Sequence, residues 1–166
     1  MRYRRANAPG GTYFFTVKLA QRTSDLLVRH IDALRAAIRA VKARHPFAIL
    51  AMVVLPDHMH AIWRLPEEDA NYPMRWSLIK AGFSRRIEPG EFIQASRQAR
   101  RERGLWQRRY WEHLIQDEMD LQRHIEYIHD NPVKHGWTNH AADWPYTSLH
   151  RYIQCGMAPA DWGGKT

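Results

Sequence analysis

The middle of the sequence contains an apolar run of strand length that ends in a tight turn. Residues 47–55 read FAILAMVVL, Pro56 and Asp57 follow directly, and residues 58–65 continue as HMHAIWRL. A short apolar run that is bounded by turn residues is typical of a buried strand. Two such segments joined by so short a turn predict a β-hairpin, and therefore a sheet with antiparallel strands.

Further strand and helix patterns flank this hairpin. Strands are expected at residues 12–19 and 105–113, and helices at 30–44, 74–87 and 118–131, where Pro132 should end the last helix. The first six elements follow the order β-α-β-β-α-β. This order predicts an α+β, ferredoxin-like fold, which is an antiparallel sheet with helices on one face. The last helix and a C-terminal tail are additions to that fold.

Length and composition favour one domain. The 166 residues suffice for one apolar core, and no apolar run approaches the roughly 20 residues that cross a bilayer. The N-terminus lacks the apolar segment of a secretory signal, and the single Cys155 excludes an internal disulfide. We therefore expect a cytoplasmic protein that does not enter a membrane, with a folded domain and basic N-terminal arm over residues 1–136 and a packed tail over 137–166.

The charge distribution favours a polyanionic partner. The net charge is +8, and the basic excess lies in residues 1–44 (+8) and 75–110 (+7), whereas residues 45–74 (−3) and 111–136 (−4) are acidic. A small domain this basic attracts nucleic acid through its field and through release of counterions. A charged surface that merely keeps the protein in solution is the alternative interpretation.

Two histidines stand out in the second strand of the hairpin. His58 and His60 are two residues apart, so their side chains should point to the same face of the sheet. Both imidazoles can then reach one metal ion. The alternative is a pair of histidines on a polar face without a metal.

A second group of polar residues lies on the predicted helix 118–131. Tyr127 and Asn131 are four residues apart and share one face, with His124 beside them. If this helix packs on the sheet, that face meets His58 and His60. Two imidazoles and an amide oxygen suit Mg²⁺ or Mn²⁺ with phosphate oxygens. A boundary tyrosine and a helix-ending asparagine are the simpler alternative.

Such a site has the groups for phosphoryl transfer. The Tyr127 oxygen can attack a phosphodiester in line while a cation offsets the charge on the nonbridging oxygens. A free phenol has a pKa near 10, so the site must help to remove its proton. The metal, His124 and a bound water all remain candidates for that role.

Several runs of the sequence resemble one known family. They are residues 53–63 (VVLPDHMHAIW), 106–113 (WQRRYWEH), 127–137 (YIHDNPVKHGW), 10–17 (GGTYFFTV) and 143–148 (DWPYTS). Together they resemble the REP-associated tyrosine transposases, relatives of the small single-strand-DNA transposases with a His-hydrophobic-His motif and one tyrosine. The resemblance spans nearly the whole chain.

The resemblance implies a ferredoxin-type fold and a metal-dependent DNA strand transferase. Such an enzyme forms a 5′-phosphotyrosine link, frees a 3′-hydroxyl and can rejoin the strands at the same site. By resemblance, His58 and His60 are metal ligands for Mg²⁺ or Mn²⁺, Tyr127 is the nucleophile and Asn131 is the third ligand. Related transposases carry a longer glutamine at the place of Asn131. Tyr110 lies near a histidine in another matching run and is the competing nucleophile.

The resemblance also implies the partner, which is single-stranded DNA with hairpins of the REP type. We expect the protein to act as a monomer, although a dimer remains open. We expect it in the cytoplasm, associated with the nucleoid. Arginines can hold the DNA backbone. The candidates are Arg2, Arg4, Arg5, Arg97, Arg100, Arg101, Arg103, Arg108 and Arg109.

Two other functions remain open. One is a hairpin-binding protein without catalysis, which would bind with EDTA present and form no covalent adduct. The other is a hydrolytic nuclease that uses a metal-bound water at the same histidines and tolerates loss of the tyrosine.

Overall fold

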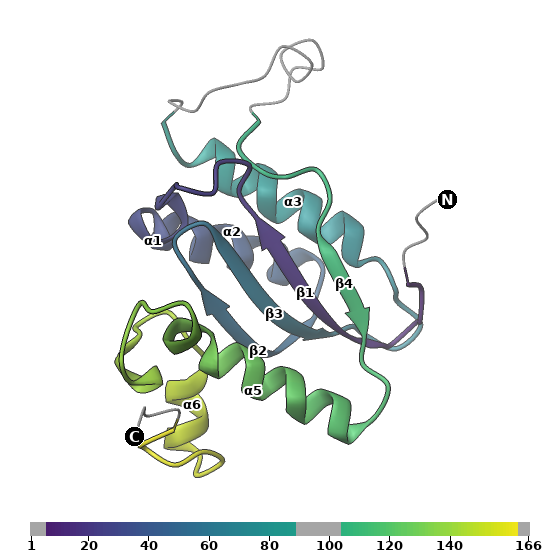
Figure 1. Cartoon of the computed structure of the whole chain (residues 1–166). Coiled ribbons are helices and arrows are strands. Elements are labelled where there is room, and N and C mark those ends of the chain that lie inside the picture. The colour runs from purple at the N-terminus through teal and green to yellow at the C-terminus, as the bar shows by residue number, and fades with distance from the viewer. Residues whose placement is uncertain (1–5, 89–103, 163–166) are drawn as a thin grey trace, which may run out of the picture.

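A four-stranded antiparallel sheet forms the centre of the protein (Figure 1). The computed structural model describes residues 6–88 and 104–162. The strands are β1 (Thr12–Lys18), β2 (Ala48–Val54), β3 (His58–Arg64) and β4 (Trp111–Leu114), in the spatial order β2-β3-β1-β4. The predicted hairpin is confirmed as β2 and β3.

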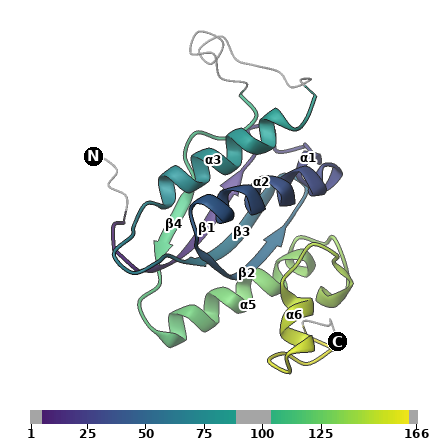
Figure 2. The same ribbon diagram turned by 180° about the vertical axis from the view of Figure 1, so that it is seen from behind.

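Helices cover both faces of the sheet. The long helices are α2 (Ile31–Arg44), α3 (Tyr72–Arg85) and α5 (Glu118–Lys134). Helices α2 and α3 lie on one face, as the ferredoxin-like prediction requires, and α5 lies on the other (Figures 1 and 2). The additional helix therefore has a sheet face of its own, on which it can bring side chains up to β1 and β3.

Alternation along β1 separates two apolar cores. Tyr13 and Phe15 point toward α2 and α3 and pack in a cluster with Trp76. Phe14 points the other way and packs in a cluster with Ile128 of α5. Because successive strand residues face opposite sides, one aromatic segment anchors helices on both faces.

The turn between β2 and β3 is tied to the end of β1. Leu55 donates its backbone N–H to the carbonyl of His58 at 2.8 Å, which closes the turn. Leu19 donates to the carbonyl of Asp57 at 2.8 Å. These bonds fix the start of β3, where His58 lies, against the end of β1.

The C-terminal segment covers the outer edge of β2. It contains the 3₁₀ turn η1 (Ala141–Asp143) and α6 (Leu149–Gln154). The short helix α1 (Leu26–Arg29) lies beside the turn that follows β2, where the Leu27 N–H donates to the Pro56 carbonyl at 3.2 Å. The Trp144 indole N–H donates to the Val54 carbonyl at 2.9 Å. Within the described ranges, no helix has the length and apolar character needed to cross a membrane.

The predicted strand over residues 105–113 is wrong at its start, because β4 begins at Trp111. Leu105, Trp106 and Tyr110 are all buried in the same apolar cluster. An extended strand would send Leu105 and Trp106 to opposite faces, so the segment bends to bury both.

The predicted end of the last helix at Asn131 is also wrong, because α5 continues through Pro132 to Lys134. The proline ring removes one backbone donor, but it lies close to the helix end, where few bonds remain to be lost. Val133 packs in a cluster with Ala141 and Leu149. This tertiary contact stabilises the last turn despite the proline.

Candidate active site

A pocket of about 410 Å³ opens between the sheet and α5. Its lining includes His58 and His60 of β3 and Tyr127 of α5. The ring centroids of His58 and His60 lie 5.0 Å apart, and those of His60 and Tyr127 lie 5.2 Å apart. The structure thus brings three of the predicted site residues together, although Tyr127 lies 67 positions after His60 in the sequence.

His60 has one nitrogen engaged and one available. Its Nδ1 lies 2.8 Å from Thr16 Oγ1 across the β1–β3 pair. Its Nε2 is buried and has no hydrogen-bond partner in the described part of the chain. Burial lowers the pKa of His60 to about 3, so the ring is neutral. When Nδ1 donates to Thr16, the Nε2 lone pair is free to bind a metal.

His58 is oriented by a carboxylate. Its Nδ1 lies 2.7 Å from Asp57 Oδ1, and Arg22 Nε donates to the other oxygen of Asp57. Burial opposes the charge on Asp57, but the bonds from Arg22 and His58 outweigh it and lower the pKa of this carboxyl. Burial also lowers the pKa of His58, against the raising effect of Asp57. A carboxylate bonded to the far nitrogen of a histidine is a common support for a metal ligand.

Tyr127 lies at the mouth of the pocket. Its side chain is 36% exposed, so its hydroxyl can be reached from solution. The edge of its ring packs against Phe14, with centroids 5.9 Å apart. The ammonium of Lys134 lies 4.9 Å from the centroid of the Tyr127 ring. The phenol is therefore held by packing and sits next to a positive charge.

Asn131 is fully buried one helical turn after Tyr127. Neither its amide oxygen nor its amide nitrogen has a hydrogen-bond partner among residues 6–88 and 104–162. Asn131 is not part of the pocket lining, unlike Tyr127 before it and His135 after it. An unpaired buried amide costs about 1–3 kcal/mol, so a bound group that satisfies it would offset that cost.

The unsatisfied atoms suit a divalent cation. The His60 Nε2 and the Asn131 oxygen are both buried without a hydrogen-bond partner in the described chain, and imidazole nitrogens and amide oxygens are both ligands of divalent cations. Of the three predicted ligands, His58 and His60 share the pocket lining and Asn131 does not, so the structure brings two of the three together.

Positive residues that the sequence analysis did not single out also line the pocket. They are Lys18 and Arg22, and Arg109, a predicted DNA-binding residue, lines the pocket with them. His135 is a further lining residue, with its ring centroid 5.4 Å from that of His58. His135 belongs to the run 127–137 that resembles the transposases, which was a usable signal. Lys18 and Arg22 carry no motif, so no sequence signal marked them.

The other predicted DNA-binding arginines lie outside the pocket lining or outside the described residues. Arg108 is exposed and lies outside the pocket lining. The remaining ones fall outside the described residues: Arg2, Arg4, Arg5, Arg97, Arg100, Arg101 and Arg103.

Tyr110, the competing nucleophile, is a core residue at the pocket wall. It is 9% exposed, and its ring packs against Phe15 and Trp76 at centroid distances of 6.1 and 6.2 Å. The Lys80 ammonium lies 5.0 Å from the ring centroid. This packing leaves Tyr110 much less accessible to a DNA strand than Tyr127.

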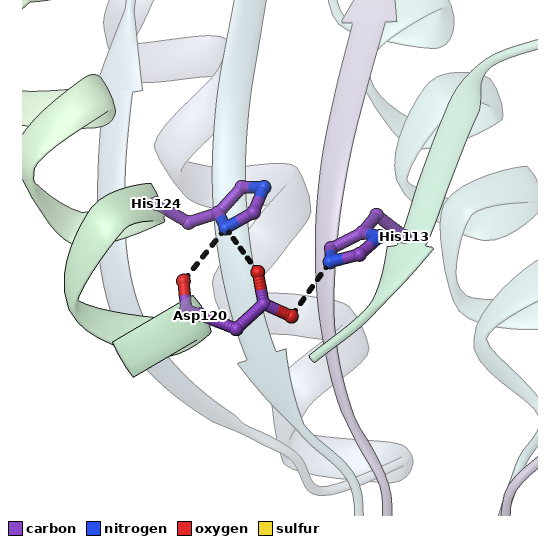
Figure 3. Close-up of side chains that lie close together, drawn as sticks. All are labelled: His113, Asp120 and His124. Carbon is purple, nitrogen blue, oxygen red and sulfur yellow. Dashed lines mark hydrogen bonds and ion pairs between the residues drawn. The ribbon is translucent and has the colours of Figure 1, made fainter. Parts of the chain in front are cut away.

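A second polar cluster connects the start of α5 to β4 (Figure 3). His113 Nε2 lies 2.8 Å from Asp120 Oδ2, and His124 Nδ1 lies 3.2 Å from Asp120 Oδ1 and 2.8 Å from the Asp120 carbonyl. Gln116 donates its backbone N–H to the same carboxylate at 2.8 Å. These bonds lower the pKa of Asp120 although burial opposes them. His124, a candidate proton acceptor, thus has its Nδ1 engaged by Asp120.

The residues of this cluster could bind a cation, or they could serve as a hydrogen-bonded contact between α5 and β4. The potential ligand atoms of His113, Asp120 and His124 lie within 4.8 Å of one another. Hydrogen bonds already account for this arrangement, because the buried carboxylate is bonded to His113 and to the Gln116 N–H, and His124 is bonded to the Asp120 carbonyl. Its structural consequence is that α5, which carries Tyr127, is fixed to the sheet at its first turn.

Comparison with known proteins identifies close relatives. The family model described as "Transposase IS200 like" matches residues 12–131. A REP-associated tyrosine transposase of Escherichia coli is 44% identical over 162 residues, which is 98% of this chain and 90% of the relative. A Haemophilus influenzae protein that carries the same family name is 46% identical over 164 residues, 98% of this chain and 93% of its own.

A solved structure supports the same relationship. It shows a REP-associated tyrosine transposase bound to a REP hairpin, at 44% identity and a TM-score of 0.85. The match covers 99% of this chain and 92% of that one. Sequence and fold therefore agree over nearly the full length.

Proposed function

The chain belongs to the REP-associated tyrosine transposases of the IS200-like family and is a DNA transposase, and we propose that it cleaves and rejoins single-stranded DNA through Tyr127. The observation that carries this proposal is the meeting of Tyr127 with His58 and His60 in one pocket. A nucleophile next to a pair of metal-binding imidazoles is what a tyrosine strand transferase requires.

The substrate is a DNA hairpin of the REP type with an unpaired strand beside it. A relative at 44% identity has been solved with a REP hairpin bound. Lys18, Arg22 and Arg109 line the pocket of this chain, so a phosphodiester entering it meets three positive side chains. These residues attract the backbone without reading its sequence.

A divalent cation, Mg²⁺ or Mn²⁺, would be held by His58, His60 and Asn131. When bound, it supplies Lewis-acid stabilisation of charge on the nonbridging phosphate oxygens. The Nδ1 atoms of both histidines are hydrogen-bonded within the protein, His58 to Asp57 and His60 to Thr16. Their bonds select the ring orientations in which the free nitrogens can bind the ion.

In the transfer step, phosphorus exchanges its bond to the 3′-oxygen of the DNA for a bond to the Tyr127 oxygen. The Tyr127 oxygen attacks the phosphorus, and the bond from phosphorus to the 3′-oxygen breaks. The 3′-oxygen takes up a proton from solvent and leaves as a hydroxyl, and the 5′-phosphate stays on the tyrosine. Because Tyr127 is 36% exposed, its proton can pass to solvent. Attack by a 3′-hydroxyl reverses the step and rejoins a strand without consuming water.

The catalytic unit is the segment 1–136, with residues 137–166 as a tail on the same domain. Support for this division is that every lining residue of the pocket within the described chain lies before residue 136. The site needs no second copy to bring Tyr127 to the histidines, so a monomer is the simplest active form. Action on chromosomal hairpins corresponds to a cytoplasmic, nucleoid-associated protein.

The test uses hairpin DNA labelled at its 3′ end, because a 5′-phosphotyrosine keeps the 3′ segment. The protein, Tyr127→Phe and Tyr110→Phe are incubated with Mn²⁺, Mg²⁺ or EDTA and run on a denaturing gel. We expect a slow-migrating labelled adduct with metal, its loss in Tyr127→Phe and its survival in Tyr110→Phe.

The other outcomes identify the competing functions. Hairpin binding in EDTA with no adduct under any metal would mean a binding protein without catalysis. Cleavage by Tyr127→Phe without an adduct would mean a hydrolytic nuclease.

A further inference from the structure

A second groove, of about 420 Å³, lies at the opposite edge of the sheet from β4. It is formed by α2, the edge strand β2 and residues 145–148 (Figure 2). Among the described residues, none lines both this groove and the pocket that holds Tyr127. We call it the β2 groove, and the proposed transfer step makes no use of it.

The β2 groove has an apolar floor and a basic rim. Its floor includes Ile38, Ile49 and Met52. Four cationic residues line it: Arg35, Arg39, Lys42 and Arg151. No acidic residue is part of its lining in the part of the chain that the structure describes.

Among the described residues, the carboxylate that pairs with this rim is Asp32, and the pair is weak. Asp32 lies 3.8 Å from Arg35, and its side chain is 97% exposed. An ion pair this exposed contributes little, so it does not cancel the positive potential of the rim.

An aromatic ring belongs to the same groove. Tyr146 lines it, and the Arg35 guanidinium lies 5.8 Å from the centroid of the Tyr146 ring. Aromatic rings and guanidinium planes are the groups on which unpaired bases stack. Basic side chains beside such a surface hold the phosphates of the same strand.

The backbone at this edge is already paired, which argues against a peptide that adds a strand. Tyr152 Oη and Arg151 donate to the Leu50 carbonyl, and Ser148 donates its N–H to the Met52 carbonyl at 2.8 Å. The Val54 N–H donates to the Tyr146 carbonyl at 2.9 Å. A peptide ligand that pairs with a sheet edge needs these groups free. A nucleic acid needs only the cations and the ring.

We propose that the β2 groove binds a segment of single-stranded DNA, with bases against Tyr146 and the apolar floor and phosphates on Arg35, Arg39 and Lys42. The inference rests on the proposed function for its choice of nucleic acid. It adds a second DNA contact, separate from the reacting phosphodiester, that retains the strand flanking the hairpin.

The test compares two double variants that lose the same charge. Arg39→Ala/Lys42→Ala removes two rim cations, whereas Arg44→Ala/Arg85→Ala removes two exposed cations outside the groove. Both are made in the Tyr127→Phe background, so that the result does not depend on strand cleavage. Circular dichroism and thermal melting confirm that each variant is folded.

Binding of a fluorescein-labelled oligothymidine is measured by anisotropy over a range of salt concentrations. Two lost phosphate contacts should reduce the steepness of log K against log salt by about 1.4, so the loss of affinity should grow about 25-fold between 1 M and 0.1 M salt. We expect this for the groove variant and a much smaller change for the control variant. Photocrosslinking with 4-thiothymidine should label the peptide that contains Tyr146.

Three results would overturn the proposal. Equal losses in both variants would mean that net charge alone matters. Unchanged oligothymidine binding in the groove variant would mean that no strand lies there. Binding of polyglutamate that depends on Arg39 and Lys42, with DNA binding unaffected, would assign the groove to an acidic protein partner. These binding assays do not depend on strand cleavage. If the adduct assay fails and the proposed function is wrong, they therefore still test the groove separately.

Discussion

Replacement of Asp120 by asparagine tests whether the polar cluster of Figure 3 fixes α5 to the sheet. The Asp120 carboxylate accepts hydrogen bonds from Gln116 and His113, lies 3.2 Å from His124 Nδ1 and is 6% exposed. The asparagine side chain has the shape of aspartate but carries no charge. Its NH₂ group replaces one carboxylate oxygen and cannot accept the hydrogen bond that this oxygen accepted. Hydrogen bonds to a charged group contribute about 1.5–3 kcal/mol, and a neutral one about 1 kcal/mol. Weakening of these bonds should lower the free energy of unfolding by about 3 kcal/mol.

The assay is urea unfolding at pH 7, followed by tryptophan fluorescence. Glu118→Gln is the matched control, because Glu118 is exposed in the same first turn of α5 and interacts mainly with the helix dipole. We expect it to cost about 0.5 kcal/mol. A double-mutant cycle with His113→Phe should show coupling above about 0.5 kcal/mol. If Asp120→Asn costs no more than Glu118→Gln, or if the cycle is additive, the cluster does not hold α5.

Three further predictions concern the metal ligands, the tail and pH. Thr16→Val removes the partner of His60 and should weaken Mn²⁺ binding about 10- to 100-fold in isothermal titration, with hairpin binding in EDTA unchanged. Trp144→Phe loses a buried hydrogen bond to β2 and should lower the free energy of unfolding by about 1–2 kcal/mol in urea titrations, while an unchanged value would mean that the tail does not stabilise the edge. Burial lowers the pKa of His129 from 6.5 to about 4. Between these two pH values, His129 is protonated in the unfolded chain and neutral in the folded protein. Stability of the metal-free protein should therefore fall as pH drops from 6.5 toward 4, by up to about 3 kcal/mol from this residue, and His129→Phe should flatten the curve.

Local patterns were sufficient to predict most of the fold. The apolar run 47–55, its turn and the helical spacing of residues 30–44 depend on neighbours in the sequence, and β2, β3 and α2 lie where these patterns place them. The errors occur where distant contacts decide. Leu105 and Trp106 bend the chain to reach one core, and Val133 stabilises a helical turn that Pro132 alone would disfavour.

The candidate site divides in the same way. The spacing of His58 and His60 fixes their common face, and the order of elements brings α5 to that face. Arg22 reaches Asp57 across 35 positions of sequence, which no local pattern encodes. His135 was missed because the helix was expected to end at Asn131. Its continuation carries His135 to the pocket, one turn beyond Asn131.

The most direct test of the proposed mechanism is to locate the phosphodiester bond on the protein. An adduct formed with hairpin DNA and Mn²⁺ is digested with nuclease and trypsin and analysed by tandem mass spectrometry. Trypsin separates the two candidate tyrosines, since Tyr127 lies in the peptide 124–134 and Tyr110 in the peptide 110–123. We predict a nucleotide mass on Tyr127. The same mass on Tyr110, or strand cleavage with no modified tyrosine, would contradict the mechanism.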